Sequence, residues 1–238
     1  MKLKLNYIKL PVLLLLVGFL FGFAEKRNNS RKVSEVKVQF VTGENLYVTE
    51  EAVNKLLIQN DVAAAGIDKE ILDLNRVESL LNNHDMIENA EAFLSLDGKL
   101  QTKISQRKPI GRIVGNSSFY LDRNGQVMPL SPYYAARVPL LMGVDSSNVI
   151  TAYPLVDYIQ KDEFLTRHIT GVKRLPGDKF ELEMRKLDFK VYFGKANDIA
   201  LKFNNFKAFY KKALQDEKLE TYKKVNLQFG DQVVCTKK

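Results

Sequence analysis

The feature that most constrains this chain is a single apolar run near its N-terminus. Residues 10–24 read LPVLLLLVGFLFGFA without a charged side chain, and Tyr7 and Ile8 continue the apolar character beyond Lys9. As a helix, residues 7–24 would be about 27 Å long, which is near the lower limit for crossing a bilayer. No second run of this kind follows in the sequence. A protein with several membrane helices is therefore excluded.

Two interpretations of this run remain open, a membrane anchor and a cleaved signal peptide. Gly22 and Ala24 have the spacing of the small residues that precede a signal-peptide cleavage site, and the N-terminal flank is basic. Against cleavage, Phe19, Phe21 and Phe23 carry the apolar run up to that site. We favour an uncleaved transmembrane helix with a cytoplasmic N-terminus. In either case the rest of the chain is exported.

The distribution of charge argues against nucleic-acid binding. The formal net charge of the chain is +8, but residues 1–32 alone carry seven basic side chains and one acidic side chain. The other 206 residues are left with 29 basic and 27 acidic side chains. A nearly neutral body lacks the broad basic surface that nucleic-acid binding requires. We therefore expect no nucleic-acid partner.

The sequence offers few residues for catalysis or for metal binding. Cys235 is the only cysteine, and His84 and His168 are the only histidines. A disulfide within the chain is excluded, and a zinc site with Cys and His ligands is not expected. His84 follows a predicted helix and His168 falls in a predicted strand, so we interpret both as structural. With no phosphate-binding loop or dinucleotide-binding motif, the sequence predicts no enzyme activity, no cofactor and no metal.

The first half of the exported part has the pattern of a small α+β unit. The alternation of residues 33–41 predicts a strand, and Thr49 is a suitable N-cap for a helix over residues 50–60. A second helix begins near Asn75, which stands at capping-box spacing from Glu78. Two strands then follow, joined by the hairpin signal Asp97-Gly98. These two strands are expected over residues 87–96 and 99–107. The predicted order is β-α-α-β-β, with the helices on one face.

The second half is predicted to be a mainly antiparallel sheet with one long helix packed on it. Asn124-Gly125 indicates another hairpin, and an amphipathic helix of roughly 18 residues starts at Asp198. The last strand alternates at Val225, Leu227 and Phe229 and is expected to continue towards residues 233 and 234. The other expected elements are a short helix and a pair of strands. They fall on residues 153–166, 179–185 and 188–194.

Taken in order, several short motifs resemble the FtsQ family, which is called DivIB in Gram-positive bacteria. The most specific motif is Gln106-Arg107-Lys108-Pro109-Ile110 with Arg112. Tyr120-x-Asp122-x-x-Gly125 and Asn226-Leu227-x-Phe229 continue the likeness. The resemblance covers nearly the whole chain and implies five segments. They are a cytoplasmic tail over 1–9, a transmembrane helix over 10–24, a linker over 25–32, a POTRA domain over 33–108 and a β domain over 109–238.

The resemblance implies a function and partners. Members of the family are non-enzymatic scaffolds of the cell-division complex, held by one helix in the cell inner membrane at the septum. They bind FtsB and FtsL outside the cytoplasm and help to control septal peptidoglycan synthesis. The family receives FtsB near its last strand, where an exposed strand edge can pair with an incoming segment. We therefore predict a partner-binding site at Tyr222, Phe229, Asp231, Val233 and Val234. Residues 99–107 are a second candidate edge, for other division proteins.

Two alternative functions stand beside this interpretation. The first is a POTRA-type module of an outer-membrane assembly or secretion system, but such proteins carry tandem repeats and a long barrel, and this sequence shows no repeat. The second is a secreted enzyme released by cleavage after Ala24. The N-terminal residue of the mature protein separates the anchored form from the secreted form.

Overall fold

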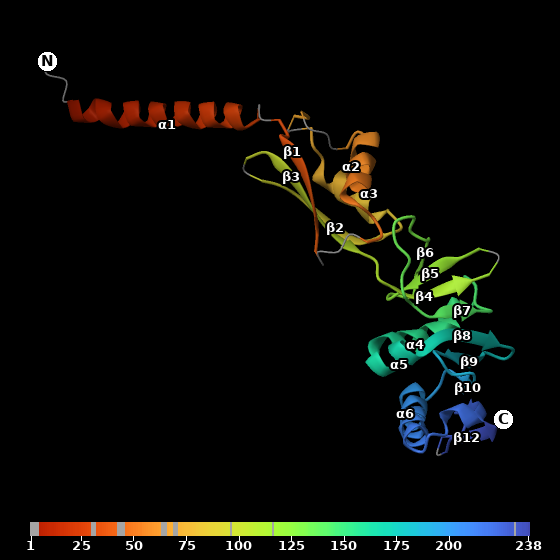
Figure 1. Ribbon diagram of the computed structural model, residues 1–238. Coiled ribbons are helices and arrows are strands. Elements are labelled where there is room, and N and C mark those ends of the chain that lie inside the picture. The colour runs from red at the N-terminus through yellow and green to blue at the C-terminus, as the bar shows by residue number, and fades with distance from the viewer. Residues whose placement is uncertain are drawn as a thin grey trace. The chain divides into compact units, whose positions relative to one another are not determined.

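The computed structural model describes residues 5–29, 32–41, 46–62, 66–68, 71–95, 97–115, 117–230 and 232–238. The chain divides into two compact units, Met1–Gln106 and Arg107–Lys238 (Figure 1). Both combine helices with β-sheet, so the predicted α+β class is confirmed.

The N-terminal apolar run forms part of a long helix, α1, over Leu5–Asn29. Its large apolar side chains between Leu10 and Phe23 are each more than half exposed. A membrane-spanning helix was expected over residues 10–24. In the part of the chain that the structure describes, no helix is both long and apolar enough to cross a membrane. The uncharged run covers only fifteen positions of α1, and Lys26 and Arg27 occupy its last turn.

The rest of the first unit is a three-stranded sheet with two helices packed on it. In chain order the elements are β1 (Glu35–Phe40), α2 (Glu50–Gln59), α3 (Leu74–Asn82), β2 (Ile87–Leu94) and β3 (Lys99–Gln106). Alternate strand residues are buried beside the helices, and Val38, Leu100 and Ile104 are among them. Leu57 of α2 and Leu81 of α3 are fully buried in the same core.

Each helix α2 and α3 begins after a residue whose side chain caps it. Thr49 accepts a hydrogen bond from the Ala52 N–H at 3.2 Å, as its N-cap position predicts. The second helix was expected to be capped by Asn75, which is wrong. Asp73 is the cap and accepts from the Arg76 N–H at 3.2 Å. Glu78 accepts instead from the N–H of Ala92 on β2, at 2.7 Å.

The strand proposed from sequence as a free edge lies in the middle of the first sheet. The sheet order is β1-β3-β2, so β3 has a neighbour on both sides. It pairs antiparallel with β2 through the predicted hairpin and parallel with β1, with Val36 opposite Leu100. The expectation that residues 99–107 form an edge is therefore wrong. The edges of this sheet are β1 and β2.

The described part of the second unit forms a nine-stranded sheet and three α-helices. Its sheet order is β12-β11-β10-β9-β8-β7-β4-β5-β6. Five neighbouring pairs are antiparallel and three are parallel, so the sheet is mainly antiparallel as predicted. The strands are β4 (Pro109–Val114), β5 (Phe119–Asp122), β6 (Val127–Met128), β7 (Leu140–Met142), β8 (Ile169–Leu175), β9 (Lys179–Met184), β10 (Lys190–Lys195), β11 (Tyr222–Asn226) and β12 (Val234–Lys237).

Helices cover one face of this sheet. They are α4 (Val149–Lys161), α5 (Glu163–His168) and α6 (Ile199–Gln215), and a short 3-10 helix, η1 (Leu219–Thr221), precedes β11. Phe203 of α6 packs against Phe193 of β10 and Tyr158 of α4, with ring centroids 5.0 and 5.4 Å apart. These contacts belong to one continuous apolar core that runs under all three helices.

Several predicted elements of this unit differ in detail. The single helix expected over residues 153–166 is two helices, because Asp162 ends α4 and caps α5, accepting from the Leu165 N–H at 3.0 Å. His168 was expected in a strand and is instead the last residue of α5. In α6 the buried face follows Phe203, Phe206 and Ala213, whereas Leu201 and Leu214 are about half exposed.

Candidate partner-binding edge

The last strand of the chain forms one end of the nine-stranded sheet. β12 pairs antiparallel with β11, with Val225 opposite Cys235 and Asn226 opposite Val234. No described strand lies on the outer side of β12. The backbone groups on that side are therefore available to an added strand. The opposite end of the sheet is β6, which has only two residues.

A tethered loop brings β12 to this position. After β11 the Gln228 N–H donates to the Asn226 side-chain oxygen at 3.0 Å, which turns the chain out of the strand. The Asn205 amide on α6 then donates to the Gly230 carbonyl at 2.8 Å. The expected single strand running from Val225 through to Val234 is therefore wrong. The segment is a hairpin, and its second strand is the free edge.

The residues predicted for the site lie in two places. Phe229 in the loop and Val234 at the start of β12 are each 42% exposed. Tyr222 lies at the far end of β11, opposite Lys237, and its half-buried ring meets Phe209 edge-on at 5.3 Å. Val233 packs partly against the core. Asp231 lies outside the described residues. The structure thus brings Phe229 and Val234 to the same end of the hairpin but leaves Tyr222 at the other end.

Lysines surround the free edge. Lys237 ends β12, and Lys223 and Lys224 stand on β11 beside it. The Lys224 ammonium lies 4.5 Å from the centre of the Tyr192 ring, and Lys238 pairs with Asp188 at 3.5 Å. Such charges discourage pairing between copies of an edge strand and favour an acidic partner segment.

One face of β12 packs partly against the core of the second unit. Cys235 packs partly against the core, and burial raises the pKa of its thiol. The thiol is therefore protonated at neutral pH. Val234 and Thr236 alternate with Cys235 along the strand and lie on the opposite face. The side chains of an added strand can contact them there.

Two residues of α6 support this site and were not predicted for it from the sequence. Leu201 is 47% exposed, and its side chain lies 4.0 Å from the position a Cβ would take on Gly230. Asn205 holds the same loop through the bond described above. Leu201 therefore lies beside the loop that carries Phe229. Leu201 is two residues before Phe203, so it does not share the 3–4 spacing of the buried residues Phe203, Phe206 and Ala213.

Both histidines make local contacts. His84 Nδ1 accepts from the Met86 N–H at 3.2 Å, and burial lowers the pKa of its ring. His168 Nδ1 lies 2.7 Å from the Phe164 carbonyl oxygen, and its ring stacks on that of Phe164 with centroids 4.2 Å apart. Across the described residues, no group of three or more His, Cys, Asp or Glu side chains is placed to hold a metal ion.

A family model matches the part of the chain that carries most of β12. The family model described as "FtsQ/DivIB, C-terminal related" matches residues 108–236, more than half of the chain. The cell division protein FtsQ of Salinibacter ruber is 26% identical over 171 residues, covering 63% of this chain and 64% of that protein. The chain therefore spans a little less than two thirds of this relative's length. Since the family match extends over nearly the whole second unit, including the loop and the free edge, the chain belongs to the FtsQ/DivIB family.

Proposed function

We propose that this chain is a cell-division protein that works by binding other proteins and not by catalysis. Two findings support the proposal: membership of the FtsQ/DivIB family, and similarity to a protein named cell division protein FtsQ. Its partners are FtsB and FtsL type proteins, and its role is to hold them at the septum where peptidoglycan synthesis is controlled. The observation that carries the proposal is the free edge of β12.

In the proposed mode of binding, a segment of FtsB adds a strand to β12. Main-chain hydrogen bonds supply affinity, and side chains on alternate positions supply specificity. Phe229 and Val234 are exposed at the loop end of the edge, where they offer apolar contacts. Val233 and Tyr222 are included in the proposed site as neighbours of this edge. Asp231, outside the described residues, is included from its place in the sequence alone. Acidic residues in the partner segment would pair with the lysines of β11 and β12.

The first unit has its own proposed role. The order of its elements after α1 is β-α-α-β-β, which suits a POTRA-type domain. We propose that other division proteins bind this domain at one of its two edge strands. β1 and β2 replace residues 99–107 as the candidate edges, because β3 is enclosed between them.

We also propose that α1 attaches the chain to the inner membrane, with a cytoplasmic N-terminus and both units outside the cytoplasm. An exposed helix surface built from Leu, Val and Phe side chains is unfavourable in water and requires a cover. The N-terminal residue of protein purified from membranes tests this. Met1 supports attachment, whereas a chain that starts at Glu25 supports the secreted alternative.

Strand addition is tested by two adjacent proline substitutions, Cys235→Pro and Thr236→Pro. Backbone N–H groups of neighbouring strand residues point to opposite sides, so one of these positions faces β11 and the other faces outward. Proline removes the N–H at either position, and at an outward position it is tolerated by an edge strand. We expect the variant that keeps the wild-type unfolding midpoint to lose FtsB binding by about tenfold or more.

The other proline variant is the matched control, because its loss of stability identifies the inward position. FtsB binding is measured by calorimetry with the full chain in detergent. Unchanged affinity in the variant that remains stable would refute strand addition at β12. Depletion in the cell gives a separate readout, since loss of a division protein produces filamentous cells; normal division after depletion would refute the cell-division role.

A further inference from the structure

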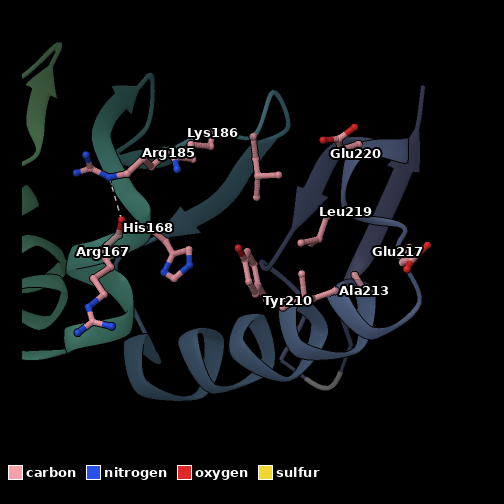
Figure 2. A pocket seen from close by; sticks show the side chains of 11 residues that line it. Arg167, His168, Arg185, Lys186, Tyr210, Ala213, Glu217, Leu219 and Glu220 are labelled. Atoms are coloured by element: carbon pink, nitrogen blue, oxygen red, sulfur yellow. Dashed lines mark hydrogen bonds between the residues drawn. The ribbon is translucent and has the colours of Figure 1, made fainter.

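The second unit has a pocket that is separate from the β12 edge. It has a volume of about 640 Å³ and opens between the end of α6, η1 and the turn that joins β9 to β10 (Figure 2). This volume is in the range of ordinary ligand sites. Its lining residues are Arg167, His168, Arg185, Lys186, Leu187, Tyr210, Ala213, Leu214, Glu217, Leu219 and Glu220. We call it the α6 pocket.

The base of the α6 pocket is apolar and firmly packed. Ala213 and Leu219 are buried, and Leu187 packs against the core. The Tyr210 ring meets the rings of Phe164 and His168 edge-on, with centroids 5.1 and 5.0 Å apart. Burial raises the pKa of Tyr210, so its hydroxyl stays protonated and can donate a hydrogen bond. In Figure 2 this hydroxyl points into the pocket.

The walls of the α6 pocket carry opposite charges. Arg167, Arg185 and Lys186 come from the end of α5 and the β9–β10 turn, whereas Glu217 and Glu220 come from the end of α6 and from η1. Figure 2 shows the basic side chains on one side and the two glutamates on the other. Among the described residues, no ion pair engages Lys186, Glu217 or Glu220, whose charges are exposed.

Arg185 of the basic wall is held in place by backbone contacts. The Arg185 Nε donates to the Arg167 carbonyl at 2.9 Å, and the Arg185 N–H donates to the His168 carbonyl at 2.7 Å. The Arg185 guanidinium is thus anchored at one nitrogen, and its other nitrogens remain for a ligand. An arginine anchored in this way loses less side-chain freedom when a ligand binds.

Because one wall is basic and the other is acidic, we infer that the α6 pocket binds a peptide segment of a protein partner. In this segment, which we call dipolar, acidic residues lie on one side of the apolar residues and basic residues on the other. One or two apolar side chains fill the base beside Tyr210 and Leu214, a carboxylate on one side meets Arg185 and Lys186, and a lysine or arginine on the other side meets Glu217 and Glu220. A segment with charges of only one sign would place like charges against one wall, which is unfavourable. This site does not depend on pairing with β12.

Three blocked hexapeptides test the inference against the full chain in detergent. The dipolar probe is acetyl-Glu-Glu-Leu-Phe-Lys-Lys-amide, and the two comparisons replace both charged ends by Glu alone or by Lys alone. Binding of fluorescent versions is followed by anisotropy. We expect saturable binding of the dipolar probe, about fivefold tighter than either comparison, because two exposed ion pairs are gained.

The double variant Glu217→Lys with Glu220→Lys makes both walls basic. The order of affinity should then change, so that the all-Glu peptide binds more tightly than the dipolar probe. A change of order cannot arise from loss of stability, which would weaken all three peptides together. Lys179→Glu is the control, because Lys179 is exposed at the start of β9 and lines neither the α6 pocket nor the β12 edge. It should leave the order unchanged.

Three outcomes would overturn the inference. They are equal binding of the three peptides, no saturable binding up to about 1 mM, and an order of affinity that the double variant does not change. The Thr236→Pro and Cys235→Pro variants separate this site from the β12 edge, because the one that remains stable should still bind the dipolar probe.

Discussion

At the scale of single residues, buried charges stabilise the ends of strands in the second unit. Lys202 is only 4% exposed, and its ammonium donates to the Lys195 carbonyl and to the Asn197 side-chain oxygen, each at 2.9 Å. It also lies 4.9 Å from the centre of the Phe193 ring. One lysine of α6 thereby fixes the end of β10 and the turn that follows it.

Lys202 should give the protein a characteristic response to alkaline pH. Burial lowers its pKa below the ordinary 10.5, and the nearby Asp198 opposes this only partly. Between the folded and unfolded pKa values of Lys202 the native state binds fewer protons at this group. The contribution of Lys202 to the free energy of unfolding therefore rises with pH in that window. We expect Lys202→Met to lose this rise. Urea unfolding from about pH 8 to about pH 11 measures it, and an identical pH dependence in the variant would contradict the expectation.

Asp122 plays the corresponding role for a hairpin. Its carboxylate is 1% exposed, and Oδ1 accepts from the N–H groups of Asn124 and Gln126 at 2.9 and 2.8 Å. Asp122→Ala removes the carboxylate that accepts these two bonds, and we expect a loss of about 3 kcal/mol in unfolding free energy. Asp122→Asn retains an acceptor oxygen and should lose less. Denaturant titration compares the two, and equal losses would argue against the role of Oδ1.

At the scale of elements, local signals in the sequence were sufficient for the hairpins. Asp97-Gly98 and Asn124-Gly125 predicted two antiparallel pairs that the structure contains, with Gly98 and Gly125 at positive φ. The parallel pairs could not be read in this way. Val36 faces Leu100 across more than sixty residues, and no short motif encodes that register. This is why β3 was mistaken for an edge.

At the candidate site, too, the local pattern could be predicted from the sequence and the contact between distant residues could not. Alternation at Val225 and Leu227 predicted β11, and the exposure of Phe229 agrees with a contact role. The turn after Asn226 depends on its side chain and on Asn205, which comes from another element. A strand pattern read along the chain contains no sign of that tether. The sequence therefore indicated the region of the edge but not which strand forms it.

The tether gives a prediction for the loop as an element. Asn205→Ala removes the donor to the Gly230 carbonyl, a bond whose net contribution is about 1 kcal/mol. We expect amide exchange to become faster in residues 227–233, with little change in the rest of the sheet. FtsB binding should weaken several-fold, because the loop must be ordered on binding. Asn204→Ala, on the exposed side of α6, is the control; equal exchange in both variants would contradict the role of the tether.

At the scale of the whole molecule, each unit has its own sheet and its own buried residues. The family match, over residues 108–236, falls within the second unit, Arg107–Lys238. A piece of this size is large enough to bury a core of its own. We therefore expect residues 107–238 to unfold in one cooperative transition when produced alone, and to retain binding to FtsB.

The position of the cut decides how stable that piece is. Arg107 Nη1 lies 3.3 Å from Asp122 Oδ2 and 3.1 Å from Gln126 Oε1, so it closes the hairpin whose turn Asp122 caps. A piece starting at residue 109, the boundary expected from the sequence, lacks Arg107 and leaves a buried carboxylate without its cation. It also lacks the Lys108 carbonyl that accepts from the Arg123 N–H at 3.0 Å. With both pieces acetylated, residues 107–238 should exceed residues 109–238 by about 2 kcal/mol in unfolding free energy. Arg107→Met in the longer piece should lower its unfolding free energy by most of that difference. Equal stability of the two pieces would show that the second unit begins after Lys108.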